Sequence, residues 1–180
     1  MATLLYPGGY DWNQDYISTL IRGPATPARI VASAGLLVFC ASIALVFERL
    51  ARVFAKHTKL IRIGGIGSMV YAAFTLTPMH DLMVMIALIF FLLAAMAILH
   101  ALYHSRAVGF FVAGCLCLAV LVASAAIYYT GYYTSALPWA QRVSFALFAI
   151  WLVALDHRRR DKQQLSHQLQ SMFLNHIEQL

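Results

Sequence analysis

The sequence has few charged side chains for its length. Asp, Glu, Lys and Arg make up 11% of the 180 residues, whereas apolar residues make up 62%. A soluble domain carries roughly 25% charged residues, and one as apolar as this would expose large hydrophobic patches to water. The composition therefore excludes an ordinary soluble fold and predicts one α-helical membrane unit.

The long apolar runs also lack ionisable residues near their centres. Proton pumps and ion transporters usually place charged or histidine side chains there, so the sequence argues against transport by charge relay. The polar side chains inside the runs are Ser and Thr, which commonly hydrogen-bond between membrane helices. No Ser–His–Asp nucleophile set can be assembled from them.

The sequence also shows neither a CxxC pair nor the pattern of a signal peptide in its first residues. Cys40, Cys115 and Cys117 lie inside apolar runs without a CxxC spacing, and we interpret them as small buried hydrophobic residues. The first residues lack a basic stretch followed by a long apolar core, so we expect no cleavable signal peptide and insertion through the first span.

Five apolar segments are long enough to cross a bilayer, which takes roughly 20 residues. They are residues 30–47, 63–79, 82–99, 107–129 and 138–155. We therefore predict a five-span transmembrane helix bundle over residues 27–155. An interfacial segment with a short amphipathic helix precedes it (residues 1–26), and a basic, amphipathic C-terminal helix follows it (residues 156–180).

Charge predicts the orientation of this bundle. Ten of the thirteen Lys and Arg residues fall on one side of the predicted spans. The three others, Arg22, Arg29 and Arg142, fall on the opposite side. The positive-inside rule places the ten in the cytoplasm, with the N-terminus outside and the C-terminus inside. Cations beside apolar runs indicate lipid headgroups as partners rather than nucleic acid.

Aromatic residues concentrate on the predicted outer face. With Arg142, they form the candidate lipid- or partner-binding set: Tyr6, Tyr10, Trp12, Tyr16, Tyr128, Tyr129, Tyr132, Tyr133 and Trp139. The alternative is a plain interfacial belt, because Trp and Tyr are common at membrane surfaces. Within this set, Asp11 and Gln14 resemble a capping box and predict the start of the short N-terminal helix.

Two histidine motifs are candidates for chemistry. His80 and Asp81 could act as an acid–base pair or bind a headgroup, although Asp81 also suits the N-terminus of a helix. His100 and His104 lie one helical turn apart and could share a metal ion. A metal needs further ligands at the same depth, so polar residues ending a helix are the alternative. We expect no cofactor.

Helical spacing continues beyond the last span. Apolar residues recur over residues 165–180, which predicts an amphipathic helix. It could extend the fifth span, lie on the membrane, or pair with another subunit in a homo-oligomer or larger complex. Small-residue pairs, Gly64 with Ser68 and Gly109 with Ala113, predict close helix contacts, either inside the monomer or between copies.

The most distinctive stretch is Tyr6-Pro7-Gly8-Gly9-Tyr10-Asp11-Trp12, followed by Tyr16-Ile17-Ser18 and a Pro78…His80 turn. With the span pattern, it resembles an uncharacterised bacterial six-span membrane family over residues 6–155. That family is similar to the FGF-receptor-activating-protein and DRAM-like membrane proteins. The resemblance implies a multi-pass protein of the bacterial inner (plasma) membrane, and its eukaryotic members imply lipid or GPI-anchor remodelling. Family members carry a helix before this stretch, so we expect that the first span is either lost or encoded upstream.

Three functions remain open from the sequence. The first is a non-enzymatic lipid-binding protein or accessory subunit, which the lack of intramembrane chemistry favours. The second is a membrane-embedded enzyme that modifies lipids at the outer leaflet with His80 and Asp81. The third is a translocator of small neutral solutes or lipids.

Overall fold

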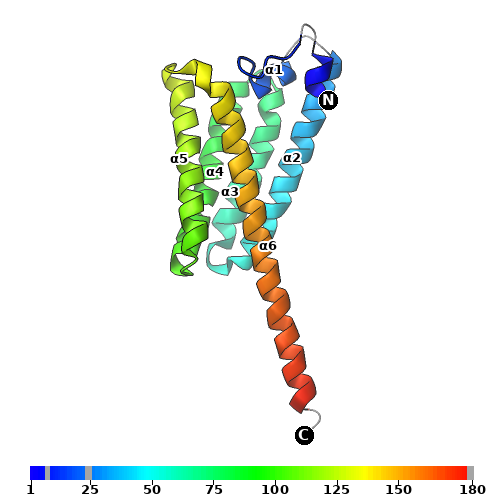
Figure 1. The fold of residues 1–180 in the computed structure, drawn as a ribbon, viewed down its shortest axis with the longest axis vertical. Coiled ribbons are helices and arrows are strands. Elements are labelled where there is room, and N and C mark those ends of the chain that lie inside the picture. Colours follow the sequence, from blue (N-terminus) through cyan, green and yellow to red (C-terminus); the bar gives the residue numbers. More distant parts are fainter. Residues whose placement is uncertain (7–8, 23–25, 178–180) are drawn as a thin grey trace.

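The computed structural model is helical throughout the chain segments whose backbone it describes, residues 1–6, 9–22 and 26–177 (Figure 1). Side chains are described within these segments up to residue 160, apart from residues 26, 55 and 159. In chain order the elements are η1 (Ala2–Leu5), α1 (Ile17–Arg22), α2 (Thr26–Val53), η2 (Ala55–His57), α3 (Thr58–Ala73), η3 (Phe74–Leu76), α4 (His80–His104), α5 (Val108–Thr130), η4 (Thr134–Ala136) and α6 (Leu137–Ile177). The described segments contain no β-strand, which confirms the predicted all-α class.

Among the described residues, four helices are long and apolar enough to cross a membrane: α2, α4, α5 and the first part of α6. The predicted segments 30–47, 82–99 and 138–155 lie within α2, α4 and α6, and residues 107–129 correspond to α5. The chain therefore has the architecture of a multi-pass α-helical membrane protein.

The predicted segment 63–79 differs from the structure at both ends. The helix there, α3, begins at Thr58 and ends at Ala73, and its 16 residues leave it outside the four candidate spans. The chain then tightens into the 3-10 turn η3, and Thr77 is extended with ψ 166°. Thr77 precedes Pro78, and a residue before proline is disfavoured in an α-helix. The proline thus ends the helix earlier than the apolar pattern predicted.

The N-terminal helix also begins later than predicted. Residues 12–14 form a turn, and the Asp11 carboxylate accepts a hydrogen bond from the Asn13 backbone N–H (2.8 Å), so Asp11 stabilises a turn rather than a helix start. α1 begins at Ile17 instead, where the Thr19 hydroxyl accepts a hydrogen bond from the Tyr16 N–H (3.1 Å). The capping-box interpretation of Asp11 and Gln14 was therefore wrong.

The last helix continues without a break past the predicted span. α6 covers 41 residues and projects away from the other helices at its C-terminal end (Figure 1). The predicted helix over residues 165–180 is therefore an extension of α6 as far as Ile177. Its amphipathic face lies outside the described side chains.

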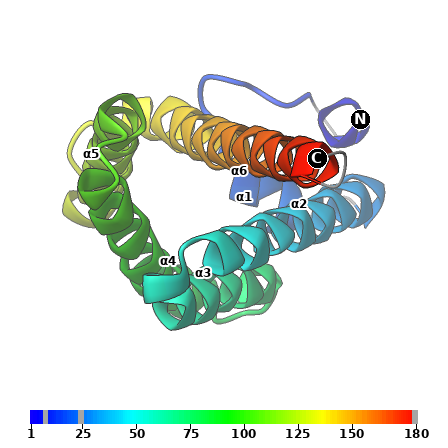
Figure 2. The same ribbon diagram turned by 90° about the horizontal axis from the view of Figure 1, so that it is seen from below.

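The helices α2 to α6 form an antiparallel bundle with two distinct ends (Figures 1 and 2). α3 packs against α2 and α4, and α5 pairs with α6. Residues 9–16, which we call the strap, cross one end of the bundle, the strap end. The end of α2, with Arg49 and Arg52, and the start of α3, with Arg62, lie at the other end, the basic end.

Small residues let the helices approach closely toward the basic end. A Cβ atom on Gly64 of α3 would lie 2.8 Å from the Phe90 carbonyl oxygen and 2.9 Å from the Ala94 nitrogen, both in the backbone of α4. Ser68, one turn later, is 1% exposed. The predicted contact at Gly64 and Ser68 is confirmed. Gly109 faces open space within this chain, so no close contact forms there inside the monomer, and a contact between copies stays a prediction.

Aromatic side chains fill the bundle where α2, α4 and α6 meet. Phe91 of α4 stands edge-on to Phe47 of α2 (6.1 Å between ring centroids) and to Phe148 of α6 (4.7 Å). The Trp151 ring continues the cluster 6.0 Å from Phe148, and its indole N–H donates to the Phe110 carbonyl oxygen of α5 (2.9 Å). This cluster joins the two groups of helices across the centre of the bundle.

The half of the bundle nearer the strap is loosely packed. It comprises residues 27–39 of α2, 80–93 of α4, 118–130 of α5 and 137–147 of α6. The buried residues among them are Ala28, Ser124, Leu137, Pro138 and Ser144. We call this part the strap half and the remainder the basic half. No residue of α4 is buried before Ala94. α5 and α6 stay in contact in this half, because the Ser124 and Ser144 hydroxyl oxygens lie 2.8 Å apart. The looser packing therefore lies along α2 and α4.

Candidate functional site

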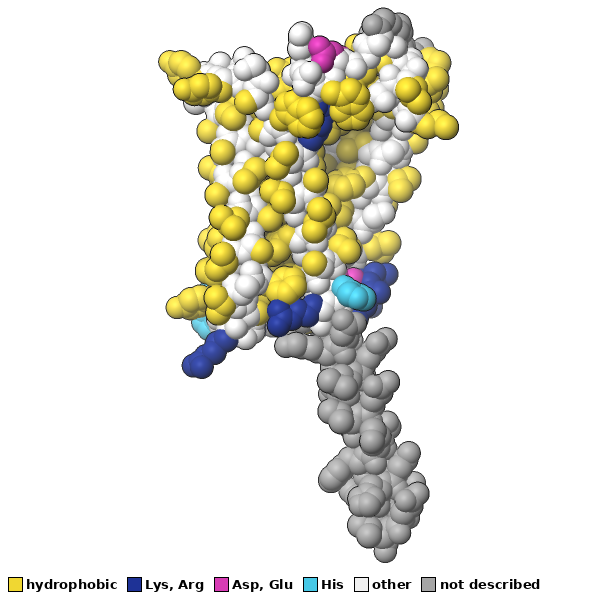
Figure 3. All heavy atoms as spheres, viewed as in Figure 1, with side chains coloured by type: hydrophobic (Ala, Val, Ile, Leu, Met, Phe, Trp, Pro, Cys, Tyr) yellow, Lys and Arg dark blue, Asp and Glu magenta, His cyan; other side chains and the backbone are white. Residues whose placement is uncertain are grey.

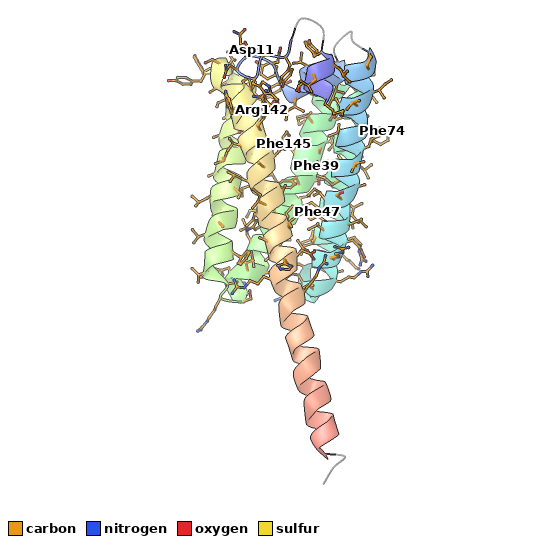
Figure 4. All side chains as sticks on the ribbon, turned by 45° about the vertical axis from the view of Figure 1, so that its right-hand side comes forward. Asp11, Phe39, Phe47, Phe74, Arg142 and Phe145 are labelled. Atoms are coloured by element: carbon orange, nitrogen blue, oxygen red, sulfur yellow. The ribbon has the colours of Figure 1, made fainter. Side chains whose placement is uncertain are left out.

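The strap is held against the start of α6 by one side chain. Arg142 donates from Nη2 to the Tyr10 hydroxyl (2.8 Å) and to the Asp15 carbonyl oxygen (2.7 Å). Its Nη1 donates to the Trp12 carbonyl oxygen. Residues more than 120 positions apart in the chain are therefore joined by a single guanidinium. In Figure 4, Arg142 lies directly beneath the strap, and Asp11 lies above it.

Three aromatic rings surround the same guanidinium. The Arg142 Cζ atom lies 5.0 Å from the Trp12 ring centroid, 5.5 Å from that of Trp139 and 5.7 Å from that of Tyr10. Such contacts attract a cation to the negative face of each ring. The Trp139 indole N–H also donates to the Asn13 side-chain oxygen (3.2 Å), which adds a second link between α6 and the strap.

This guanidinium has no anionic partner among the described residues. Its acceptors are neutral oxygens, and its Nε atom is buried without a hydrogen-bond partner. The carboxylates of the strap accept backbone hydrogen bonds instead: Asp11 from the Asn13 N–H and Asp15 from the Asp11 N–H. The guanidinium therefore forms no ion pair with a described carboxylate.

Below this site the bundle opens between α2 and α6. Figure 3 shows an apolar recess there, beneath the strap and between the two helices. Phe39 of α2 (38% exposed) and Phe145 of α6 (51% exposed) lie in this region, and the buried Phe47 ring lies below them (Figure 4). We call this recess the α2–α6 opening. Its floor is the cluster of Phe47, Phe91 and Phe148.

The predicted His80–Asp81 pair does make a direct contact. His80 Nδ1 lies 3.0 Å from Asp81 Oδ1 at the start of α4. The same carboxylate oxygen accepts a hydrogen bond from the Tyr128 hydroxyl of α5 (2.8 Å). Tyr128 is thus the residue of the predicted aromatic set that meets the histidine motif. Sequence alone could not pair two residues 47 positions apart.

The remaining aromatics of the predicted set do not form one surface. Tyr6 stacks edge-on against Tyr10 (6.1 Å), and Tyr129 against Tyr128 (5.1 Å). Tyr132 and Tyr133, beyond α5, are 74% and 81% exposed. Tyr16 marks the start of α1. The structure therefore gathers Tyr10, Trp12, Trp139 and Arg142 into one site and leaves the other members around it.

Three histidines meet at the basic end. The ring centroids of His100 and His104 are 4.2 Å apart, and that of His57, from η2, is 5.0 Å from His100. His104 Nδ1 is paired with the His100 carbonyl oxygen (3.0 Å). Within the described segments no group of three or more His, Cys, Asp or Glu side chains is arranged to hold a metal ion. His100 also borders an apolar groove of about 780 Å³ between α4 and α5.

Two acidic residues at the basic end escaped the sequence analysis. Glu48 of α2 pairs with Arg62 of α3 (2.7 Å) and with Arg52 (3.0 Å). Asp156 of α6, 6% exposed, lies 3.6 Å from Arg49 of α2 and also pairs with Arg160. The i, i+4 spacings within α2 and α6 were visible signals. The contacts between helices required the fold.

Fold and site together define a multi-pass α-helical membrane protein with a cationic, aromatic site over a loosely packed half of its bundle. No family model, curated protein or solved structure matches the chain.

Proposed function

We propose that the chain crosses the bacterial plasma membrane five times with the strap end outside. The cations at the basic end support this orientation under the positive-inside rule. α3 with η3 supplies the fifth crossing: 16 helical residues at 1.5 Å and three 3-10 residues at about 2 Å reach roughly 30 Å, the thickness of the hydrocarbon core. α3 also packs along both α2 and α4.

In this membrane, the protein binds a lipid in the strap half of the bundle, between α2 and α6. The observation that carries this proposal is the α2–α6 opening, an apolar recess beneath the strap (Figure 3), with the Phe47 ring below it (Figure 4). Water-filled apolar recesses are unfavourable, and hydrocarbon is the solvent available at this depth. An acyl chain that enters sideways from the outer leaflet would cover the exposed faces of Phe39 and Phe145.

The depth of the opening matches half a bilayer. Trp139, at the mouth, and Phe148, in the floor, are nine residues apart on α6, or about 14 Å along the helix. One leaflet contributes about 15 Å of hydrocarbon. Trp139 then lies at headgroup level, where tryptophan is enriched. A lipid tail would reach the floor without crossing the midplane.

Photolabelling in lipid nanodiscs tests this site. A phospholipid with a photoreactive group in its acyl chain should label peptides that contain Phe39 and Phe145 several-fold more than the peptide that contains Phe74. Phe74 is the matched control, because its 49% exposure is close to the 51% of Phe145, while it lies on η3 between α3 and α4. Equal labelling of Phe145 and Phe74 would show ordinary annular lipid and would refute a bound lipid.

A second candidate function rests on the His80–Asp81–Tyr128 contacts. A carboxylate at Nδ1 orients an imidazole and leaves Nε2 free for proton transfer, which is the arrangement of a general base. Placed at the outer leaflet, this group could serve an enzyme that modifies lipid headgroups. Lipid binding in the α2–α6 opening does not require the His80–Asp81–Tyr128 contacts.

Substitution separates the two functions. If the protein is such an enzyme, His80→Ala and Asp81→Asn should each alter the lipid profile of the host membrane as deletion of the protein does, whereas Tyr129→Phe, beside Tyr128, should not. A profile unchanged by deletion of the whole protein would remove the enzymatic candidate and leave the photolabelling result untouched.

A further inference from the structure

We infer that the lipid held in the α2–α6 opening is an anionic phospholipid whose phosphate is bound by Arg142. This inference rests on the proposed lipid-binding function and adds the chemistry of the headgroup. It concerns the place where the Arg142 guanidinium, which forms no ion pair with a described carboxylate, meets the apolar opening beneath it.

The hydrogen-bond set of Arg142 is incomplete. The two Nη atoms donate to strap oxygens, while Nε is buried without a partner. A guanidinium carries five N–H donors. Nη2 uses both of its N–H groups and Nη1 uses one, so the second Nη1 N–H is left for another acceptor, whereas Nε is covered by protein atoms. A charge-assisted hydrogen bond from this Nη1 donor to a phosphate oxygen is favourable.

The acids of the strap do not occupy this position. The carboxylates of Asp11 and Asp15 accept hydrogen bonds from the strap backbone, at 2.8 and 2.9 Å. Asp11 lies on the far side of the strap from Arg142 (Figure 4). An anion that arrives from the opening therefore meets the guanidinium from the bundle side, with the acids on the water side.

The aromatic rings discriminate against a choline headgroup. Faces of Trp12, Trp139 and Tyr10 could bind a quaternary ammonium by cation–π attraction. Here they already surround the Arg142 guanidinium at 5.0 to 5.7 Å, so an ammonium would meet a like charge. Phosphatidylglycerol, whose headgroup carries a phosphate and no cation, fits both the free donor and the apolar opening.

Native mass spectrometry of the intact protein tests the headgroup. The protein is exchanged into detergent with equal amounts of dioleoyl phosphatidylglycerol and dioleoyl phosphatidylcholine, and the retained lipid is counted. We expect about a ten-fold preference for phosphatidylglycerol, equivalent to about 1.4 kcal/mol. Arg142→Gln should remove the preference. Arg29→Gln removes an exposed cation near the strap end of α2 and should retain the preference for phosphatidylglycerol.

A third variant covers the structural role of Arg142. Arg142→Lys keeps the charge but not the planar fork, and it should keep a clear preference for the anionic lipid. Loss of the preference in Arg142→Lys as complete as in Arg142→Gln, at unchanged helix content, would assign Arg142 to holding the strap alone and overturn the inference. A loss of equal size in Arg29→Gln would also overturn it.

The outcomes separate this inference from the proposed function. Equal retention of the two lipids, with photolabel still concentrated at Phe145, would refute the anionic headgroup and leave the lipid site standing. No retained lipid and no selective label would refute both. A preference that depends on Arg142, together with selective label, supports both.

Discussion

The basic half and the strap half of the bundle are built from equally apolar helices but are packed differently. In the basic half, Gly64 of α3 brings its helix to within van der Waals distance of the α4 backbone, and Phe47 is fully buried. In the strap half, Phe39 and Phe145 are 38% and 51% exposed, and Gly35 has open space around it. Small side chains at the helix contacts therefore give a tightly packed basic half, whereas the strap half keeps exposed rings that a ligand can cover.

The two halves are also closed by different interactions. At the basic end, Asp156 of α6 forms an ion pair with Arg49 of α2. This ion pair joins the two helices that border the α2–α6 opening. At the strap end the strap is bound to α6 through Arg142, and no ion pair or hydrogen bond between α2 and α6 is found there among the described residues. A bundle pinned at one end and bridged by a loop at the other can admit a ligand without losing its core.

The largest expected effect is the loss of the aromatic floor. Phe47→Ala should lower the free energy of unfolding by about 3 kcal/mol, because it leaves a cavity between Phe91 and the rest of the core. Phe145→Ala, in the strap half, should cost less than about 1 kcal/mol. Unfolding by SDS in mixed micelles measures both. Similar losses for the two variants would show that the halves are packed alike.

Crowding the helix contact should have the next largest effect. Gly64→Leu forces a side chain into space where a Cβ atom would already lie 2.8 Å from a backbone oxygen, which should destabilise the bundle by about 2 kcal/mol. Gly35→Leu is the matched change in the strap half, where nothing lies within 4 Å, and should leave the thermal midpoint unchanged or raised. A midpoint lowered by Gly35→Leu would contradict the open packing of α2.

The ion pairs of Asp156 at the basic end should contribute least to stability. Asp156→Asn removes the charge that faces Arg49 and Arg160, and should cost about 1 kcal/mol because both arginines remain partly exposed to water. Asp11→Asn, at the strap end, keeps an oxygen for the Asn13 N–H and should cost nothing measurable. High salt should narrow the difference between wild type and Asp156→Asn; a difference that salt does not change would argue against an ionic origin.

Helix existence could be read from the sequence more securely than helix ends or helix contacts. The apolar runs in α2, α4, α5 and α6 were recognisable because each is long and free of central charge. The end of α3 was misplaced, since Pro78 acts on the backbone of the preceding residue and leaves the apolar pattern unchanged. The start of α1 was misplaced because Asp11 can cap either a turn or a helix.

The candidate site was predictable only in part. Arg142, Trp12 and Trp139 were recognised as outer-face residues from composition and the charge rule. Their convergence was not, because Trp12 and Arg142 are 130 positions apart. The partner of Asp81 was missed for the same reason. Asp156 was overlooked, since a single acid among arginines resembles part of a solvated tail until its helix is packed against Arg49.

The sequence by itself determined the class of this protein. A backbone inside a membrane has no water to bond with, and a helix satisfies its N–H and C=O groups within one apolar segment. The sequence also determined which end of the bundle is basic. The tertiary structure decided where those helices touch. Small residues let them approach closely near Gly64, the Phe145 ring stays half exposed, and Arg142 binds the strap to α6. Such contacts join distant residues, and only the folded bundle brings them within reach.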